Sequence, residues 1–377
     1  MIEKEFEDGL LLVRPEDMQP FVLNSSGMVI WRHISQGRAA SEAAEELVKA
    51  FGIPLQLAIK DTEAALEQWT QTGLIGDSGK HNQKAPGHNL NDAPAFEEIS
   101  FHSRRTYSFM GRIFSARYSS RLLEFLAHPK IAGFEVRNMA PEWDVSIVDC
   151  GGFYTLYKEG RAKYIVYTEE KIVGALFGAI RDFVYPDEEW LILTHGAAIG
   201  RDGRAALMPA YFGSGKSTLT ASLVKSGFRY FSDDMAPLTS SATPEVAPFP
   251  VDLCLKEGSW APLAPFYPEL GGLEPGCKGD GRAVKYIPVP QNSMAEAPAP
   301  VKFLLFPSYQ PGSRAEFEPL SMFETLSLIS GSSSPVMVSE ENMELLVDWV
   351  RNTPSFLFRL DNLPEAVEAF TSLWEGP

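Results

Sequence analysis

The sequence predicts a mixed α/β fold, α+β overall, in three parts. A stretch rich in Gly, Pro, Asn and Asp at 76–96 is typical of a linker and sets off a small N-terminal domain, 1–75. Three consecutive strand-like runs indicate a strand-rich part at 97–185. Beyond it, a strand–loop–helix–strand series predicts an α/β core at 186–377.

The first 75 residues predict a winged-helix-like domain of two or three strands and three short helices. The runs LLLVRP (10–15) and PFVLN (20–24) have strand composition, with a turn between them. Three runs with helical spacing follow, each with a cap or stop residue. They are SGMVIWRHIS after Asn24 or Ser25 and before Gly37, SEAAEELVKAF before Gly52, and a span of about 55–72 before Gly73.

Local patterns also predict the elements of the other two parts. The runs VSIVDC, GFYTLYKEG and AKYIVYT predict an antiparallel meander, and EEKIVGALFGAIRDFVY predicts a helix that stops before Pro186. In the core, EWLIL, RAALMPA and FRYFS predict strands, and STLTASLVKSG predicts a helix. At the end, FLFRL and EAVEAFTSLW predict a closing strand and an amphipathic helix.

Charge and cysteine content narrow the class of protein. The net charge is −16, which repels nucleic acid and anionic lipid, so we expect neither a nucleic-acid nor a membrane partner. Cys150, Cys254 and Cys277 show no metal-ligand spacing, and the start MIEKEFEDGL has no signal-peptide character. We therefore expect a cytoplasmic protein with reduced thiols. Any nucleotide site must provide its own local positive potential.

The strongest motif is AYFGSGKST at 210–218, between a strand pattern and a helix pattern. Glycines let backbone amides converge on phosphate oxygens, and the helix N-terminus adds its positive dipole. Lys216 would neutralise the β- and γ-phosphates, and the Ser217 hydroxyl would ligate Mg²⁺. Ala210 stands where such loops usually begin with Gly. We predict an ATP and Mg²⁺ site whose cofactor-binding residues are Gly213, Ser214, Gly215, Lys216, Ser217 and Thr218.

Polar residues follow two neighbouring strand patterns. Asp233 and Asp234 come directly after FRYFS, at the strand end that faces the ligand crevice in open α/β sheets. One carboxylate could hold Mg²⁺ while the other accepts the proton of an attacking hydroxyl. His195 follows EWLIL and could hydrogen-bond an aspartate or a phosphoryl oxygen. An acidic turn and a core histidine are the alternative interpretations.

Residues 191–238 resemble the HPr serine kinase family, whose catalytic core shows the same order of HG, G-x-G-K-S and G-x-R-x-x-x-DD. The resemblance implies a P-loop kinase core of the HPr kinase/phosphoenolpyruvate carboxykinase type, transfer from ATP to a protein serine, and a homo-oligomer. It implies Asp233 as the base, with Asp234, His195 and Lys216 as further catalytic residues. Ser217 and Asp234 would be metal ligands.

Two cations and one further resemblance bear on the acceptor. Lys256 and Arg282 are candidates for phosphate or acceptor contacts, or else solvated surface charges. The run from FVLNSSGMVIW to ALEQWTQTGLI resembles the PqqD-like peptide chaperones of pyrroloquinoline quinone biosynthesis. That resemblance implies a peptide or small protein captured as an added strand by residues 1–75. A winged helix used only for packing is the alternative.

The sequence is compatible with three functions. The first is an ATP-dependent kinase for a Ser or Thr hydroxyl of a peptide, a precursor of a ribosomally made, modified natural product of the lasso type. The second is a kinase for a small-molecule hydroxyl, with a structural N-terminal domain. The third is a nucleotide-dependent peptide chaperone or adaptor that transfers no phosphoryl group.

Overall fold

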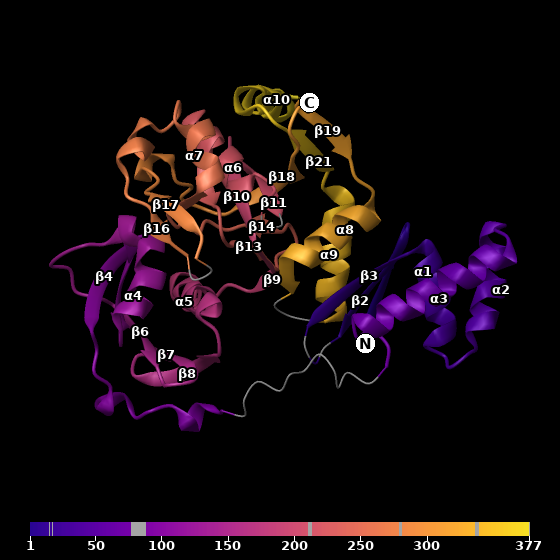
Figure 1. The fold of residues 1–377 in the computed structure, drawn as a ribbon, viewed down its shortest axis with the longest axis horizontal. Coiled ribbons are helices and arrows are strands. Elements are labelled where there is room, and N and C mark those ends of the chain that lie inside the picture. Colours follow the sequence, from indigo (N-terminus) through magenta and orange to yellow (C-terminus); the bar gives the residue numbers. More distant parts are fainter. Residues whose placement is uncertain are drawn as a thin grey trace.

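The structure is a computed structural model, and it describes residues 1–14, 16, 18–76, 88–209, 213–278, 281–335 and 339–376, with only the backbone at 334 and 335. Residues 77–87 of the expected linker therefore lie outside the described residues. Figure 1 shows the chain from indigo to yellow, with the N-terminal residues beside the yellow helices α8 and α9. None of the helices in the described ranges has the length and apolar character needed to cross a bilayer.

Residues 1–76, here called the N-terminal module, form a three-stranded antiparallel sheet and three helices. These are β1 (Ile2–Phe6), β2 (Gly9–Arg14), β3 (Gln19–Asn24), α1 (Ser25–Ile34), α2 (Ala40–Phe51) and α3 (Leu55–Gln71). The Asn24 side chain caps α1 by accepting from the Gly27 amide at 2.8 Å. Gly52 ends α2 in the left-handed conformation at φ 65°. The expected elements are present, and β1 joins the two strands whose runs were named.

Both faces of the module's sheet are covered. Leu10 and Leu12 on β2 pack against the module's own helices. Leu11 and Val13, which alternate with them, belong to a different apolar cluster together with α8 and α9. The module is therefore packed into the rest of the chain by one complete face of its sheet.

Residues 88–189 contain the strand-rich subdomain, a five-stranded sheet in the order β4-β5-β6-β7-β8 with helices against it. Its elements are β4 (Ser103–Phe109), β5 (Arg112–Tyr118), α4 (Arg121–Ala127), β6 (Trp143–Asp149), β7 (Tyr154–Lys158), β8 (Arg161–Val166) and α5 (Glu169–Val184). Short 3-10 helices span Leu90–Asp92, Phe96–Glu98, His128–Lys130 and Ala132–Phe134. The expected meander is β6-β7-β8, and α5 is the expected apolar helix.

The core is built on a ten-stranded sheet in the order β12-β10-β11-β18-β14-β13-β9-β20, with β21 also paired to β18 and β19 to β21. Its strands are β9 (Trp190–Thr194), β10 (Gly196–Arg201), β11 (Arg204–Pro209), β12 (Arg229–Ser232), β13 (Ala236–Thr239), β14 (Glu245–Val246), β18 (Ala299–Tyr309), β19 (Glu316–Pro319), β20 (Ser333–Pro335) and β21 (Ser355–Leu360). A separate small sheet contains β15 (Leu253–Lys256), β16 (Gly276–Cys277) and β17 (Ala283–Ile287). Two further 3-10 helices span Pro268–Gly272 and Gln291–Ser293.

Helices cover both faces of the large sheet. One apolar cluster joins it to α6 (Lys216–Lys225), α7 (Glu257–Leu263) and α10 (Leu363–Glu375). The other joins it to α8 (Met322–Ser332), α9 (Glu340–Asn352) and the N-terminal module. Strand β10 is antiparallel to both β11 and β12, so β11 and β12 point in the same direction. The carboxyl ends of β11 and β12 therefore lie at the same edge of the sheet. The mixed α/β class predicted from the sequence is confirmed.

Candidate functional site

The loop between β11 and α6 has the backbone that an anion cradle requires. Gly213 and Gly215 have φ values of 89° and 90°, in the region that favours glycine. Helix α6 begins at Lys216, and no side chain among the described residues caps it, so its first amides are available to a ligand. The Ser214 hydroxyl is buried and has no hydrogen-bond partner among the described residues. Ala210 lies outside those residues.

Lys216 and Asp233 form a buried ion pair. Their exposed fractions are 8% and 4%, and Lys216 Nζ lies 3.1 Å from Asp233 Oδ1. The same ammonium group donates to the Asp233 backbone oxygen. The loop lysine and the aspartates after β12, which are 17 residues apart in the chain, therefore occupy one site.

His195 lies at the junction of β9 and β10, beside the aspartates. Its Nδ1 is 3.0 Å from the Asp234 backbone oxygen, and because a carbonyl oxygen only accepts, Nδ1 is assigned the hydrogen. Burial and then the charge of Lys216 lower the pKa of His195, which favours the neutral ring. In this tautomer Nε2 has a lone pair.

Lys130, which the sequence did not single out, is the partner of the Asp234 carboxylate. It comes from the 3-10 helix His128–Lys130 of the strand-rich subdomain and is 6% exposed. Burial would raise the pKa of Asp234, but Lys130 and then Lys216 outweigh it, so the pKa stays far below its usual range. The site therefore contains two lysine–aspartate pairs, and Asp234 is held ionised.

A cavity of about 460 Å³ opens on Asp234 and His195, between α5 and the turn from β16 to β17. The turn contributes the positive side chains of Lys278 and Arg282 to its lining, and α5 contributes both acidic and apolar side chains. Its lining residues are Leu126, Lys130, Glu169, Glu170, Val173, Gly174, Phe177, Leu193, Thr194, His195, Asp234, Met235, Cys277, Lys278, Arg282 and Tyr286. The volume is within the range of small-ligand pockets.

The two candidate cations, Lys256 and Arg282, belong to this positively charged region. Arg282 lines the cavity, and Lys256 is the residue before α7. Burial, then Arg282 and Lys278, lower the pKa of Lys256, with a smaller effect from Lys216. Mutual repulsion of this kind requires the cations to be close together. The chain is acidic overall, yet its lysines and arginine gather where the sequence analysis required a local positive potential.

The remaining predicted residues differ in their surroundings. Ser217 is half-buried in the first turn of α6, whereas the Thr218 hydroxyl lies 2.7 Å from the Ser259 hydroxyl on α7. Among the described residues, no three His, Cys, Asp or Glu side chains gather as a metal centre. The predicted metal ligands Ser217 and Asp234 offer only two oxygen-donor groups, so a Mg²⁺ ion held by them would also need phosphate oxygens to complete its coordination.

The N-terminal module presents β3 at the edge of its sheet, paired only with β2 among the described strands. This strand lies beside α8 and β20, and the module makes a further contact with α8: the Phe323 amide in the first turn donates to both carboxylate oxygens of Asp8, at 3.1 and 3.2 Å. Its elements follow the order strand, strand, strand and three helices. Residues 9–75 match the family model of coenzyme PQQ synthesis protein D (PqqD). The PqqD match thus begins at β2 and ends just after α3.

Two further comparisons accompany the PqqD match. A search of curated proteins found none that matches this chain. Among solved structures, the HPr(Ser) kinase/phosphatase from Coxiella burnetii aligns with 15% identity over 49% of this chain and 99% of its own, with a TM-score of 0.25.

Proposed function

We propose that this chain is an ATP-dependent phosphotransferase that acts on a hydroxyl group of a peptide. The observation that carries the proposal is the contact of Lys216 with Asp233 at 3.1 Å, at the start of an uncapped helix that follows a glycine loop. A lysine and free amides bind phosphate, and a carboxylate beside them can serve the transfer. Few other ligand classes need all three groups together.

Nucleotide binding would use the loop 213–218. The first α6 amides and the Ser214 hydroxyl suit phosphate oxygens, since no side chain in the part of the chain that the structure describes binds either of them. Lys216 would turn from Asp233 to the β- and γ-phosphates, which leaves Asp233 without its cation. A bound Mg²⁺ would neutralise charge on the phosphates, held by Ser217 and Asp234.

The two aspartates suit different tasks. Asp234 has a pKa far below its usual range because of Lys130 and Lys216, although burial opposes them. Such a carboxylate is a weak proton acceptor but a permanent charge for a metal ion. We therefore propose that Asp233 accepts the proton of the acceptor hydroxyl and that Asp234 is a metal ligand. Neutral His195 would contact the acceptor or the phosphoryl group.

The reaction is a direct transfer. The acceptor oxygen forms a bond to the γ-phosphorus while the bond from that phosphorus to the β-phosphate oxygen breaks, and ADP leaves. The hydroxyl proton passes to Asp233. Lys278 and Arg282 of the cavity, with Lys256 beside them, would contact an acidic part of the acceptor.

Peptide binding is supported by the PqqD match at 9–75 and by the position of β3 at the end of its sheet, where no described strand pairs with it although α8 and β20 lie nearby. An extended segment could add to this edge as a further strand. This would place a tethered acceptor at high local concentration near the site. The precursor of a ribosomally made peptide product, with a leader and a core segment, is the substrate class proposed.

Mass spectrometry of a co-expressed precursor peptide tests this function. We expect one or more additions of phosphate with the wild-type chain and none with Lys216→Ala or Asp233→Asn. A precursor without its leader should be modified much more slowly at equal concentration. Release of phosphate with no labelled peptide would instead favour the nucleotide-dependent chaperone.

A small-molecule acceptor is the second candidate because the cavity has a volume of about 460 Å³. Deleting residues 1–75 is a poor test of this alternative, since Phe6, Leu11 and Val13 are part of a core cluster with α8 and α9. Changing the substrate avoids that problem. Equal rates with leaderless and full-length peptide, together with transfer to a small alcohol, would support this candidate.

A further inference from the structure

The segment 128–135 belongs to the strand-rich subdomain but reaches the candidate site 104 residues further along the chain. It consists of the two 3-10 helices His128–Lys130 and Ala132–Phe134 and the residue that follows them. Contacts on two sides hold this segment, and Lys130 lies between them. These contacts show how a residue so distant in sequence is aimed at Asp234.

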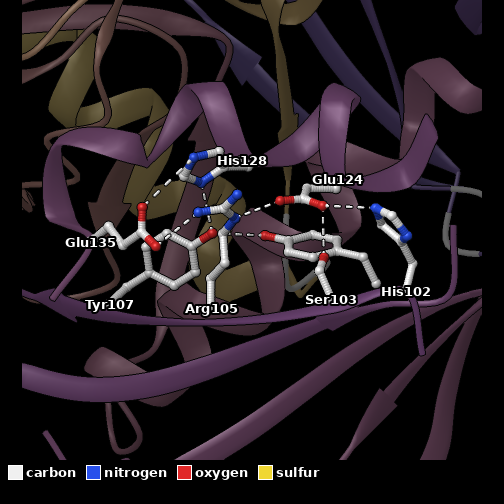
Figure 2. Close-up of polar contacts among 8 residues, drawn as sticks. His102, Ser103, Arg105, Tyr107, Glu124, His128 and Glu135 are labelled. Carbon is white, nitrogen blue, oxygen red and sulfur yellow. Dashed lines mark hydrogen bonds and ion pairs between the residues drawn. The ribbon is translucent and has the colours of Figure 1, made fainter. Parts of the chain in front are cut away.

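Figure 2 shows the first set of contacts, which fixes both ends of the segment to its own subdomain. At one end, His128 Nδ1 lies 2.9 Å from the Tyr107 hydroxyl on β4. At the other end, Glu135 accepts from the Arg105 guanidinium at 2.8 Å. Arg105 also donates to Glu124 of α4 at 2.5 Å. The segment is therefore anchored to a sheet and a helix rather than left as a free loop.

The second set of contacts joins the segment to the core beside the site. The Asp252 amide donates to the Lys130 backbone oxygen at 2.9 Å, and the Gly133 amide donates to Asp252 Oδ2 at 2.8 Å. Asp252 is only 2% exposed, so this contact excludes water. A Cβ atom at position 133 would lie 2.6 Å from Asp252 Oδ1, so the close approach requires glycine.

We propose that Lys130 is a positioning residue of the phosphoryl-transfer site, which holds the Asp234 carboxylate until a divalent cation arrives with the nucleotide. The Gly133–Asp252 contact fixes the backbone that presents Lys130. This inference rests on the proposed function, since it assigns Asp234 to the metal. In this arrangement the strand-rich subdomain completes the site through Lys130. It also makes the divalent cation bind together with the nucleotide rather than before it.

The physical reason lies in two opposite effects of one charge. The Lys130 ammonium and a divalent cation need the same oxygens of Asp234, so Lys130 opposes metal binding when no nucleotide is present. The same ammonium attracts nucleotide phosphates, so it favours the nucleotide–metal complex. Removing the charge of Lys130 should therefore strengthen binding of the metal alone and weaken binding of the nucleotide–metal complex.

Two binding measurements on the full-length chain test this inference. Electron paramagnetic resonance of free Mn²⁺ gives metal affinity without nucleotide, and calorimetry gives the affinity for ATP in excess Mg²⁺. For Lys130→Met we expect Mn²⁺ alone to bind about tenfold more tightly and Mg²⁺–ATP about tenfold more weakly. A purely structural role would weaken both.

Three further variants sharpen the test. Lys130→Arg should restore both affinities toward the wild type, because the charge is kept. Gly133→Ala should reproduce the opposite shifts with Lys130 still present, because the added methyl group displaces the segment from Asp252. Lys158→Met is the matched control: it removes a lysine of the same subdomain, 3.1 Å from Asp182, and should change neither affinity.

Unchanged affinities in Lys130→Met, or parallel weakening of both, would overturn the inference. The outcome is separable from the proposed function. If the wild-type chain binds no ATP, the proposed function fails, and the Mn²⁺ measurement alone still decides the role of Lys130. Tighter Mn²⁺ binding then supports the competition with Asp234, and equal Mn²⁺ binding contradicts it.

Discussion

Asp252 shows at the scale of one residue how a contact between subdomains can reduce stability. Burial raises its pKa to about 6 from 3.8, although the Gly133 amide acts in the opposite direction. The folded chain therefore holds this proton more tightly than the unfolded chain does. The carboxyl group favours the folded state most at low pH, and this advantage is lost as pH rises from about 4 to about 6.

We predict that Asp252→Asn raises the free energy of unfolding at pH 7.5. The neutral amide keeps an acceptor oxygen for Gly133 and removes a charge that costs up to about 3 kcal/mol to bury ionised. Urea unfolding at pH 7.5 and pH 4.5 measures the change in the free energy of unfolding that the substitution causes. The gain over the wild type should shrink at the lower pH; a gain that grows on acidification would contradict the assigned environment.

Single residues also mark the limit of prediction from sequence. Lys216, Asp233, Asp234 and His195 were found because each follows a strand pattern or belongs to a motif, and the structure brings them together. Lys130 has no such signal, since HPKIAGF is neither a motif nor a strand end. Its role depends on a tertiary contact between segments that no local pattern relates.

At the scale of elements, local chemistry identified the start of α1 and the end of α2 at Gly52, but α1 already ends at Ile34, before Gly37, and α2 begins at Ala40 with no side-chain cap among the described residues. Of the two candidate caps, Asn24 and Ser25, it is the Asn24 side chain that accepts from the Gly27 amide, at 2.8 Å. The strands β14 and β16, by contrast, have two residues each. So short a run contains no readable periodicity, and its pairing is decided by the strands beside it.

Asn24→Ala should reduce the free energy of unfolding by about 1 kcal/mol, because the first turn of α1 loses its cap. Asn24→Asp is the matched control, since a carboxylate oxygen can accept from the same amide. Equilibrium unfolding in urea measures both. Equal losses for the two variants would mean that the cap contributes little.

At the scale of the whole molecule, the N-terminal module shares an apolar cluster with the core. The uninterrupted apolar run LLLV in β2 is typical of a strand covered on both faces, a signal that could have predicted the docking. Leu11 packs with α8 and α9, whereas its neighbour Leu12 packs with α1, α2 and α3. Peptide capture and phosphoryl transfer would therefore take place at a fixed separation.

Leu11→Ala and Leu12→Ala form a matched pair that tests this docking. Each should cost roughly 2–5 kcal/mol, because each removes a fully buried side chain. Hydrogen exchange should then separate them: Leu11→Ala should speed exchange in both β2 and α9, and Leu12→Ala mainly within the module. Exchange changes confined to the module in both variants would argue against the shared cluster.

We propose that the loop 213–218 and Asp233 together bind a nucleotide and support phosphoryl transfer. Calorimetric titration of the full-length chain with ATP and Mg²⁺ tests it most directly, using Lys216→Met and the exposed control Lys163→Met. We predict saturable binding by the wild type and the control, and a loss of at least about tenfold in affinity with Lys216→Met. Equal affinity in all three chains, or no binding by the wild type, would rule out a nucleotide site at this loop.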